Sequence, residues 1–543
     1  MKLITLNLLK RFIGSPSEKV SLLNKYFFSK NTSKPDVSSN EKIAMEFVTD
    51  PVFFGLMSII ASHIKDTSNI DIDLVVTRSL NASFGNNTFS YIKRSSIINY
   101  LYLRPWLKKF PLTYNIGFRS KNIWPNIYKI YFYFAAYNKW KKWCNLYKKN
   151  GQKELIINDI IIDDLIIDTY LRFYPSANFD VKNKFTFKII RECYNQLYLA
   201  NKYFKTAKPL AYLTTQTVYL EHGIAVRCAQ KNNIKVFSLG DETHFGLIID
   251  STQFSHARSG KNYKKLFISQ DDFLKKKMIS EARKIMQNRF QGNIDPSISY
   301  MKTSSYANVQ INQSSTNKYN GCIVVFLHDY FDSPHLYENM IFDDFWEWSV
   351  FTIKALISAK VKFYVKPHPN QIYLNINVIT KLKKMFPEVN FLDISISNST
   401  LVKSNIRAAI TAYGTIANEF AYFGKPSICC ADHPHIAFDF CYTAKNKNEY
   451  INLINKVSEL NFGVDLPLRL KYRKDALEYF SIKNNLHDAE LASVSNAFRE
   501  FWRYCGNDTM NNIEDLSKIS NRLSSNIGFI KFIENLTKHR GEV

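Results

Sequence analysis

Short apolar runs alternate with helix-like segments along most of this chain, and the alternation restarts after a polar segment at 303–319. Upstream, the runs IAMEFV, FFGLMSIIASHI and NIDIDLVV are typical of a strand, a helix and a strand. Downstream, the runs CIVVFL, KFYV, IRAAIT and PSICCA repeat the strand pattern. Strands that alternate with helices form parallel sheets covered on both faces. The sequence therefore predicts an α/β protein of two halves joined by a linker, each built around parallel strands.

Composition along the chain predicts five segments. They are a flexible basic extension, an N-terminal α/β domain, a linker, a C-terminal α/β domain and a set of C-terminal helices: 1–41, 42–302, 303–319, 320–465 and 466–543. The linker is assigned because its residues are polar, almost uncharged and without periodicity. An aromatic and basic helical insertion is expected at about 95–150 within the N-terminal domain.

The 543 residues carry 72 Lys and Arg against 47 Asp and Glu, a net charge of +25. This excess predicts attraction to anions such as nucleic acid, acidic lipid, phosphorylated donors or acidic glycans, without choosing among them. The eight cysteines include no C-x-x-C pair, and we expect no Cys/His cluster at metal-ligand spacing, which is typical of a protein of the reducing cytoplasm. No apolar run approaches the roughly 18 residues of a spanning helix, so the chain is expected to be soluble or peripheral to a membrane.

The insertion contains interleaved aromatic and Lys residues, as in YLYLRPWLKKF and NIWPNIYKIYFYFAAYNKW. Such a pattern fits bases stacked on the rings, an anionic membrane surface, or ordinary helical packing with a solvated Lys face. Of the two binding functions we favour the membrane surface and expect no nucleic acid.

The stretch Tyr-Val-Lys-Pro-His-Pro-Asn-Gln at 364–371 follows a short alternating strand pattern. Its two prolines end the strand and restrict His368 between them. Ligands of α/β sheets collect outside the carboxyl ends of the strands, so Lys366 and His368 are well placed to meet an anion. The alternative is a Pro-rich surface turn.

A second stretch, Thr-Ala-Tyr-Gly-Thr-Ile-Ala-Asn-Glu at 411–419, follows another predicted strand. Thr415 is expected at the N-cap of a helix whose free N–H groups favour an anion, and Gly414 permits close backbone approach. Glu419 lies four residues on, on the same helix face, where a carboxylate accepts hydrogen bonds from ribose hydroxyls. An ordinary strand-helix-strand unit is the alternative.

A third stretch, Phe-Leu-His-Asp-Tyr-Phe at 326–331, follows the first strand of the C-terminal domain. His328 and Asp329 are therefore expected at the same edge as Lys366, where they could fix a bound sugar or phosphate. The segment Ser333–His335 with Glu338 is equally consistent with the N-cap of the next helix.

Taken together, the Lys-Pro-His-Pro and Gly-Thr-x-x-x-Glu-x-x-x-x-Gly-Lys-Pro motifs resemble the nucleotide-binding half of GT-B glycosyltransferases. Within them, the chain is most similar to bacterial capsule and surface-polysaccharide enzymes of the Kdo-transferase-like and sialyltransferase-like families, over about 320–440. In those families the His-Pro loop contacts the donor phosphate, and the helix start with its Glu contacts phosphate and ribose. The resemblance implies these roles for Lys366, His368, Thr415 and Glu419. It also implies a GT-B-like fold, in which two Rossmann-like domains face a central cleft, with helical additions. The N-terminal domain would then face the acceptor and the C-terminal domain would bind the nucleotide. The block at 163–172 also resembles a segment of those families, with Asp163 where they have Gly.

Glycosyl transfer needs a base for the acceptor proton, or a carboxylate nucleophile if configuration is retained. Asp241 and Glu242, directly after the predicted strand IKVFSL, are the expected catalytic residues. Neighbouring strand residues point to opposite faces, so at most one is expected to be catalytic, and a polar βα loop is the alternative. Weaker candidates for the base are Asp163, Asp164 and Asp168. Glu221–Gly223 and Arg227 offer a possible substrate contact, although an ordinary helix surface is favoured there.

The predicted function is transfer of a sugar from a nucleotide-sugar, with CMP favoured, to a surface polysaccharide or lipid-linked glycan. The predicted site needs no metal or other cofactor, since a Lys, a His and a helix N-terminus offset the charge of a leaving phosphate. The chain is expected in the cytoplasm, on the inner face of the membrane. A polyol-phosphate transferase of the teichoic-acid type and a non-catalytic basic binding protein are the alternatives.

Overall fold

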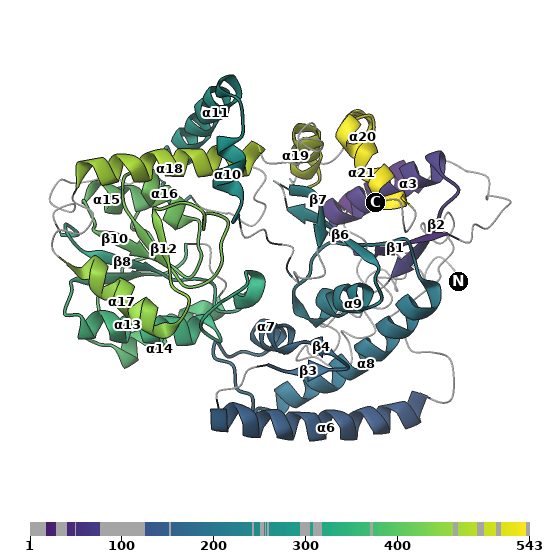
Figure 1. Cartoon of the computed structure of the whole chain (residues 1–543), viewed down its shortest axis with the longest axis horizontal. Helices are drawn as coiled ribbons and strands as arrows, with labels where there is room; N and C mark the ends of the chain where they lie inside the picture. Colours follow the sequence, from purple (N-terminus) through teal and green to yellow (C-terminus); the bar gives the residue numbers. More distant parts are fainter. Residues whose placement is uncertain are drawn as a thin grey trace, which may run out of the picture. The chain divides into compact units, whose positions relative to one another are not determined.

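The computed structural model describes residues 18–28, 41–75, 125–150, 154–249, 255–293, 304–307, 318–459, 465–485, 494–506 and 512–538, with breaks at 49, 242–243, 256, 258–259 and 370–372. The chain divides into two compact units. The N-terminal unit comprises Met1–Tyr174, Asp180–His256 and His487–Val543, and the C-terminal unit comprises Pro175–Phe179 and Ala257–Leu486. Each contains one five-stranded sheet (Figure 1). The α/β class and the two Rossmann-like units are thus confirmed.

The sheet of the N-terminal unit has the order β2-β1-β5-β6-β7. Its strands are β1 (Lys42–Glu46), β2 (Asp71–Val75), β5 (Ala211–Thr214), β6 (Lys235–Asp241) and β7 (His244–Ile249). The first four in the sheet are parallel, whereas β7 runs antiparallel to β6. Strands β1 and β5 are almost entirely buried, as expected of a parallel sheet with both faces covered.

Helices cover this sheet, and a two-stranded ribbon of β3 (Ile156–Ile157) and β4 (Ile160–Ile161) accompanies them. The helices are α2 (Glu18–Phe28), α3 (Pro51–Thr67), α6 (Pro125–Asn150), α7 (Asp163–Phe173), α8 (Lys184–Ala207), α9 (Tyr219–Lys231), α19 (Val494–Gly506), α20 (Ile513–Ser524) and α21 (Ile527–Thr537). Asp50 caps α3 by accepting from the N–H groups of Val52 and Phe53 at 3.0 and 3.3 Å, and Pro51 fits its first turn.

The sheet of the C-terminal unit has the order β12-β11-β10-β8-β9. Its strands are β8 (Ile323–Phe326), β9 (Phe363–Lys366), β10 (Ala408–Ile410), β11 (Ser427–Cys429) and β12 (Cys441–Thr443), and all pairs are parallel. The surrounding helices are α10 (Tyr263–Ile268), α11 (Asp272–Phe290), the 3-10 helix η1 (Pro334–Leu336), α13 (Phe345–Ser358), α14 (Leu374–Met385), α15 (Asn398–Lys403), α16 (Ile416–Tyr422), α17 (Lys447–Ser458) and α18 (Leu466–Asn485).

The units divide the chain differently from the predicted domains. Helices α10 and α11 pack against α18, so the C-terminal unit takes in residues from 257 onward, before the predicted linker. The predicted C-terminal helices 466–543 also separate between the units. Helix α18 belongs to the C-terminal unit, whereas Leu516 and Phe529 of α20 and α21 lie in the same core as Met45 and Leu56 of the N-terminal unit.

In each sheet there is a place where the strand order reverses, because successive strands are added first on one side and then on the other. In the C-terminal unit the chain runs from β8 to β9 on one side, and from β10 to β11 and β12 on the other, so the change lies between β8 and β10. In the N-terminal unit it lies between β1 and β5 by the same argument. Ligands of open α/β sheets bind beyond the carboxyl ends of the strands at such a switch point. These two places therefore define where a site is to be sought.

Candidate functional site

The switch point of the C-terminal unit brings His328 and Thr411 together. His328 follows β8 and Thr411 follows β10, and their Nε2 and Oγ1 atoms are 2.9 Å apart. The N–H of Ala412 also donates to Nε2 of His328, at 3.3 Å. Since Nε2 accepts, the other ring nitrogen, Nδ1, carries the hydrogen. His328 therefore lies in the place that the sequence predicted, with a fixed tautomer.

The surroundings of His328 keep its ring neutral. The imidazole stacks on Phe345 with 4.7 Å between ring centroids and 10° between ring planes. Burial, together with the nearby His368, lowers the pKa of His328 to about 3. The ring can therefore donate one hydrogen bond from Nδ1 without carrying a charge at neutral pH.

Lys366 ends β9 and is almost fully buried, at 2% exposure. Its Nζ donates to Oδ1 of Asn398, the first residue of α15, at 2.8 Å. Burial lowers the pKa of Lys366 to about 8, although the carboxylate of Glu419 opposes the shift. The ammonium group is therefore mostly protonated at pH 7, and a buried cation gains most from an anionic partner.

His368 follows β9 and Asp329 follows β8, and the two side chains are close enough for the charge of Asp329 to act on His368. Burial lowers the pKa of His368, Asp329 opposes that shift, and Lys366 adds to it. Asp329 accepts the N–H of Phe331 at 3.0 Å, which fixes the turn after β8. The predicted residues Lys366, His368, His328 and Asp329 thus share one edge of the sheet.

Gly414 and Thr415 follow β10 at the same edge. A Cβ atom at position 414 would lie 2.7 Å from Oγ1 of Thr411, so a side chain there would displace Thr411. The predicted close approach of the Gly414 backbone to an anion stays a prediction. Thr415 is exposed and occupies the N-cap position of the short helix α16, but its side chain makes no capping hydrogen bond. Its predicted phosphate contact remains a prediction.

Glu419 is held by protein groups. Its Oε2 accepts from the hydroxyl of Tyr306 at 2.8 Å, and its Oε1 is 2.5 Å from Nη2 of Arg289. The carboxylate therefore joins α11 and the segment around Tyr306 to α16. Its predicted contact with ribose stays a prediction, and its observed role is to position α16 and to oppose the loss of charge on Lys366.

The predicted catalytic pair lies in a hairpin of the N-terminal unit. Asp241 ends β6 and pairs with His244 of the antiparallel β7, so the element after β6 is a strand and not the helix of the expected βα unit. The side chain of Asp241 and the whole of Glu242 lie outside the described residues. Their catalytic role stays a prediction.

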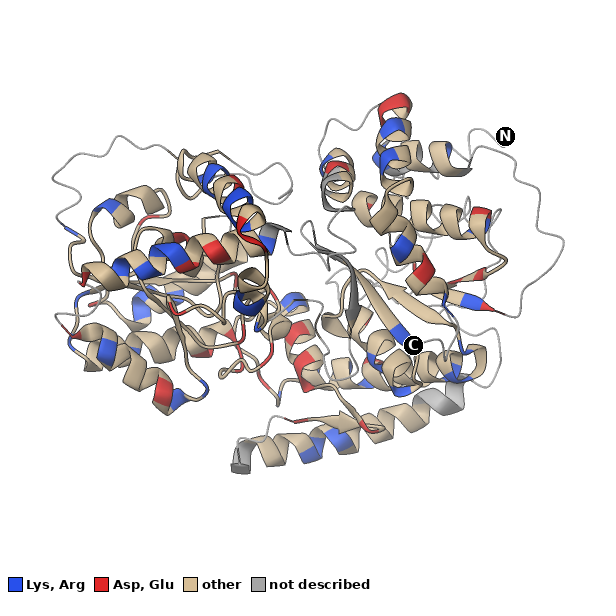
Figure 2. Ribbon diagram, turned by 45° about the horizontal axis from the view of Figure 1, so that its top comes forward, with Lys and Arg blue, Asp and Glu red and all other residues tan. Residues whose placement is uncertain are grey.

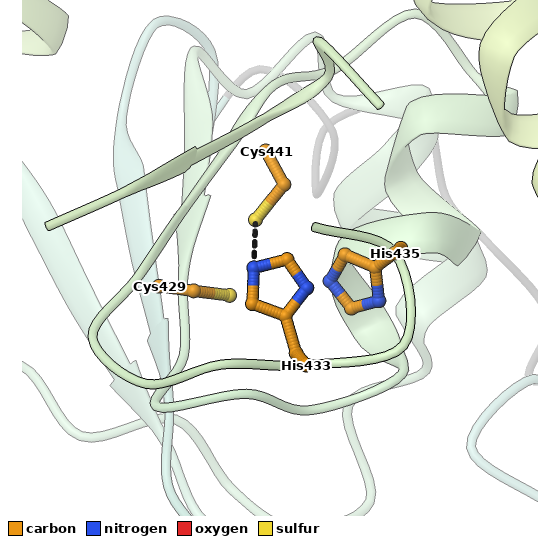
Figure 3. A group of neighbouring side chains, drawn as sticks. All are labelled: Cys429, His433, His435 and Cys441. Atoms are coloured by element: carbon orange, nitrogen blue, oxygen red, sulfur yellow. Dashed lines mark hydrogen bonds between the residues drawn. The ribbon is translucent and has the colours of Figure 1, made fainter. Parts of the chain in front are cut away.

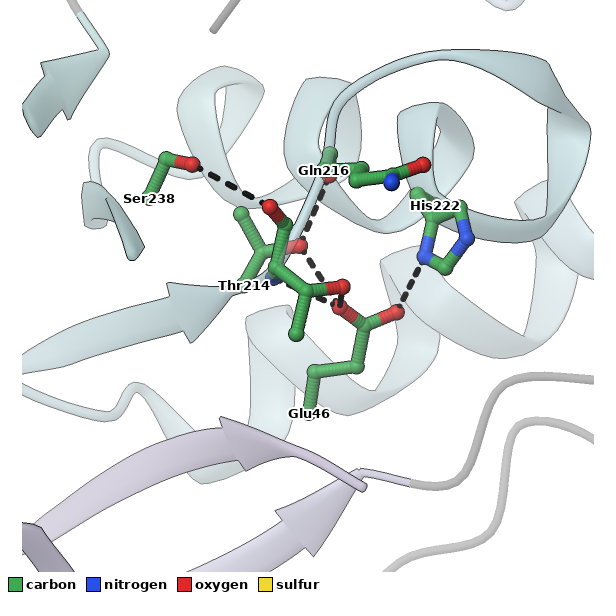
Figure 4. Close-up of polar contacts among 6 residues, drawn as sticks. Glu46, Thr214, Gln216, His222 and Ser238 are labelled. Carbon is green, nitrogen blue, oxygen red and sulfur yellow. Dashed lines mark hydrogen bonds and ion pairs between the residues drawn. The ribbon is translucent and has the colours of Figure 1, made fainter. Parts of the chain in front are cut away.

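The switch point of the N-terminal unit holds a buried carboxylate that sequence reasoning missed. Glu46 ends β1, and its Oε2 accepts from the Thr214 hydroxyl at 2.9 Å and from both the hydroxyl and the N–H of Thr215 at 2.8 Å (Figure 4). Its Oε1 is 2.6 Å from Nδ1 of His222 on α9. The signal in the sequence is an acidic residue within the apolar run IAMEFV.

Glu46 and His222 form an ion pair. Burial opposes charge on both groups, but their mutual attraction outweighs it. The pKa of Glu46 is therefore lowered, with help from Thr215, and the pKa of His222 is raised to about 9. His222, whose side chain is 14% exposed, is a protonated hydrogen-bond donor at neutral pH. It is thus more than the helix-surface residue that was favoured from sequence.

The weaker predicted candidates for the base have structural partners. Asp163 accepts the N–H of Leu155 at 3.2 Å, and Asp164 forms an ion pair with Arg227. Asp168 is buried at 1% exposure on α7. These contacts join α7, α9 and the ribbon, which explains the acidic cluster without catalysis.

The expectation of no Cys/His cluster is wrong. The side chains of four residues of the C-terminal unit lie together, with one possible ligand atom from each within 4.8 Å of the others: Cys429, His433, His435 and Cys441.

A separate hollow of about 900 Å³ lies between α11 and α18, lined in part by Lys275, Arg283, Arg473 and Lys474. It contains none of the predicted site residues.

No protein-family model and no curated protein matches the chain. Among solved structures, the chain is similar to Thermosulfurimonas dismutans KpsC, a beta Kdo 2,4 transferase, at 12% identity and a TM-score of 0.28, over 46% of this chain and 79% of that one. It is also similar to UDP-GlcNAc 2-epimerase from Neisseria meningitidis bound to UDP-GlcNAc, at 8% identity and a TM-score of 0.25, over 82% and 96%. The UDP-GlcNAc 2-epimerase of Methanocaldococcus jannaschii is 12% identical, with a TM-score of 0.25, over 77% of this chain and 92% of that one. At these values the site must be judged from its own residues.

Proposed function

We propose that the chain is a glycosyltransferase that moves a sugar from a nucleotide-sugar donor to a cell-surface polysaccharide or a lipid-linked glycan. The donor is a CMP-linked sugar, such as Kdo or a sialic-type sugar. The observation that carries the proposal is the group of Lys366, His368 and His328 at the switch point of an all-parallel sheet. A buried cation with two imidazoles beside it, at the edge where such sheets bind ligands, suits a phosphate.

The chemistry follows from the charges. When the bond between the sugar and the nucleotide breaks, negative charge develops on the departing phosphate. Lys366 is a cation at neutral pH and offsets that charge, while His328 donates a hydrogen bond from Nδ1 without adding a second positive charge. One cation matches the single phosphate of CMP, and the proposed transfer needs no metal.

The acceptor hydroxyl must lose its proton. His222 is already protonated below about pH 9, so it is suited to donating a hydrogen bond and poorly suited to taking a proton. We therefore keep Asp241 or Glu242 as the proposed base. Separate replacements by Asn and Gln should give one severe and one mild loss of transfer, whereas two mild losses would place the base elsewhere.

A thermal-shift panel of CMP, CDP, UDP and GDP tests the donor class, because each donor leaves its own nucleotide. A ligand at 100 times its Kd stabilises by about 2.7 kcal/mol, which such a scan resolves. We expect CMP to stabilise the chain, and Lys366→Ala to remove that effect. Lys362→Ala is the control, since Lys362 is exposed and lies directly before β9, four residues before Lys366. Failure of all four nucleotides to stabilise the wild type would refute the proposed donor site.

Turnover separates an enzyme from a binding protein. His368→Ala should largely abolish transfer while the chain stays folded, and near-normal turnover would refute its role. A larger shift with CDP than with CMP would favour the polyol-phosphate transferase. Nucleotide binding without transfer to any glycan acceptor would favour the non-catalytic alternative.

We also infer that α6 attaches the chain to the inner membrane surface. Ile130, Tyr131 and Phe134 are each at least 60% exposed on this helix. Lys141 lies over the rings of Tyr137 and Trp140 further along it. Exposed rings followed by Lys suit an anionic interface.

Elsewhere among the described residues, Lys and Arg are spread over helices of both units (Figure 2). No helix of the described residues is long and apolar enough to cross a bilayer.

A further inference from the structure

The connection between β11 and β12 lacks the element that such a connection normally has. Parallel neighbouring strands are usually joined by a crossover that contains a helix, because the chain must return to the same end of the sheet. Residues 430–440 make this return without any helix. The connection nevertheless packs inward, with Phe438 and Phe440 in the core beside α18. Something other than helical packing is needed to hold it.

Four potential metal ligands lie at this connection. Cys429 ends β11, Cys441 begins β12, and His433 and His435 come from the segment between them. Their exposures are 0%, 8%, 0% and 1% in that order. One ligand atom from each lies within 4.8 Å of the others. Figure 3 shows the side chains of the two cysteines and the two histidines gathered in one place.

The hydrogen bonding of the two imidazoles is incomplete. Nε2 of His433 is 2.7 Å from the Thr443 hydroxyl and 3.6 Å from Sγ of Cys441. Nδ1 of His433 and Nε2 of His435 have no hydrogen-bond partner within the part of the chain that the structure describes. A fully buried ring nitrogen without a partner costs free energy, so its presence calls for an explanation such as an ion.

We propose that Cys429, His433, His435 and Cys441 bind a Zn²⁺ ion. Two thiolates and two imidazoles are a donor set that zinc prefers in structural sites, whereas Ca²⁺ and Mg²⁺ prefer oxygen. In tetrahedral geometry, bonds of about 2.0–2.3 Å place the ligand atoms about 3.3–3.8 Å apart. The separation of 3.6 Å between Sγ of Cys441 and Nε2 of His433 already lies in that range, and binding through Nε2 would replace the hydrogen bond of this nitrogen with the Thr443 hydroxyl. The four ligand atoms all lie within 4.8 Å of one another.

The four ligands define the role of the ion. Four protein ligands leave no open position for water or substrate, so the site is structural. The ion joins the end of β11, the start of β12 and the segment between them. Beside it, the N–H of Cys430 donates to the carbonyl of Ala412 at 2.9 Å, and the N–H of Asp432 donates to Glu338 at 2.9 Å. The ion thereby stiffens the segment next to the loop that contacts His328.

Metal analysis of the full-length chain, purified under reducing conditions without chelator, tests the proposal directly. We expect about one zinc per chain by mass spectrometry, released when the thiols are alkylated in denaturant. Replacement by Co²⁺ should give the visible absorption of a tetrahedral site with thiolate ligands. Well below half a zinc per folded chain, after incubation with excess Zn²⁺, would overturn the proposal. So would a disulfide between Cys429 and Cys441 in the reduced preparation.

Variants identify the ligands. Cys441→Ser and His435→Asn should lose the tetrahedral Co²⁺ spectrum or bind the ion much more weakly. Cys430→Ser is the matched control, because Cys430 is buried next to Cys429 but is outside the group. If Cys441→Ser does not fold, the metal content of the wild type still decides the question. An unchanged spectrum in both ligand variants would contradict the assignment.

Discussion

The ion pair of Glu46 and His222 makes the stability of the N-terminal unit depend on pH. The pKa of His222 rises from its ordinary value of 6.5 to about 9 in the fold, because Glu46 outweighs the effect of burial. A group whose pKa is raised on folding stabilises fully below its unfolded pKa and loses that contribution as the pH rises through its folded pKa. The shift corresponds to about 3 kcal/mol. Most of this contribution should therefore disappear between pH 6.5 and pH 9.

Glu46→Gln tests this reasoning. Removing one partner of a buried ion pair typically costs about 3–5 kcal/mol. We expect a cost of that order at pH 6.5 and a clearly smaller one above pH 9, where His222 is neutral in the wild type. Urea unfolding, followed by hydrogen–deuterium exchange of peptides from β1 and α9, measures the free energy of the N-terminal unit separately.

The control for Glu46→Gln is Asp159→Asn, which removes a carboxylate from an exposed pair in the same unit. Asp159 lies 3.3 Å from Lys231 and is 93% exposed, so its loss should change the free energy of unfolding little at either pH. The reasoning fails if the wild type is equally stable at pH 6.5 and pH 9. It also fails if the cost of Glu46→Gln is the same at both.

Four further measurements test the remaining assignments. CMP affinity, measured by calorimetry, should fall as the pH rises through about 8, because Lys366 loses its charge there, and a flat profile would contradict the phosphate contact. Gly414→Ala should weaken CMP binding at least tenfold, since its Cβ would meet Thr411 at 2.7 Å, and normal affinity would show that the turn can relax. Adding a chelator during urea unfolding should lower the urea concentration at the unfolding midpoint of the wild type, but not that of a zinc-free Cys441→Ser variant. Sedimentation with anionic vesicles should weaken for the double variant Tyr131→Ser, Phe134→Ser, and unchanged binding would place the membrane contact elsewhere.

The fold could be predicted from the sequence because parallel strands have a local signature. Runs such as CIVVFL and IAMEFV are continuous and apolar, since both faces of the sheet are covered. The residues directly after those runs were also predictable, because the carboxyl ends of parallel strands share one edge. The positions of His328 and Lys366 at that edge were predicted in this way, whereas their roles stay predictions. The division into units was not predictable, because the packing of α20 and α21 on the first sheet depends on contacts between residues about 470 positions apart.

The pair of Glu46 and His222 shows why part of a site escapes sequence analysis. Each residue alone looks ordinary: an acidic residue at a strand end, and a histidine on a helix. Their partnership depends on β1 and β5 being neighbours, which the order of strands in the chain does not reveal. Once the order is known, the switch point between these two strands indicates where polar groups should be sought.

The Cys/His group was missed for a different reason, because its spacing is local and fully visible in the sequence. A search for C-x-x-C pairs passes over Cys-x-x-x-His-x-His-x-x-x-x-x-Cys. The better signal is mechanical: two strands of a parallel sheet are joined by a segment with no helical pattern, and that segment needs another means of attachment. Cysteine and histidine at its ends and middle supply one, provided that the thiols stay reduced. The cytoplasmic location predicted from the absence of paired cysteines is therefore the condition under which this site would bind its ion.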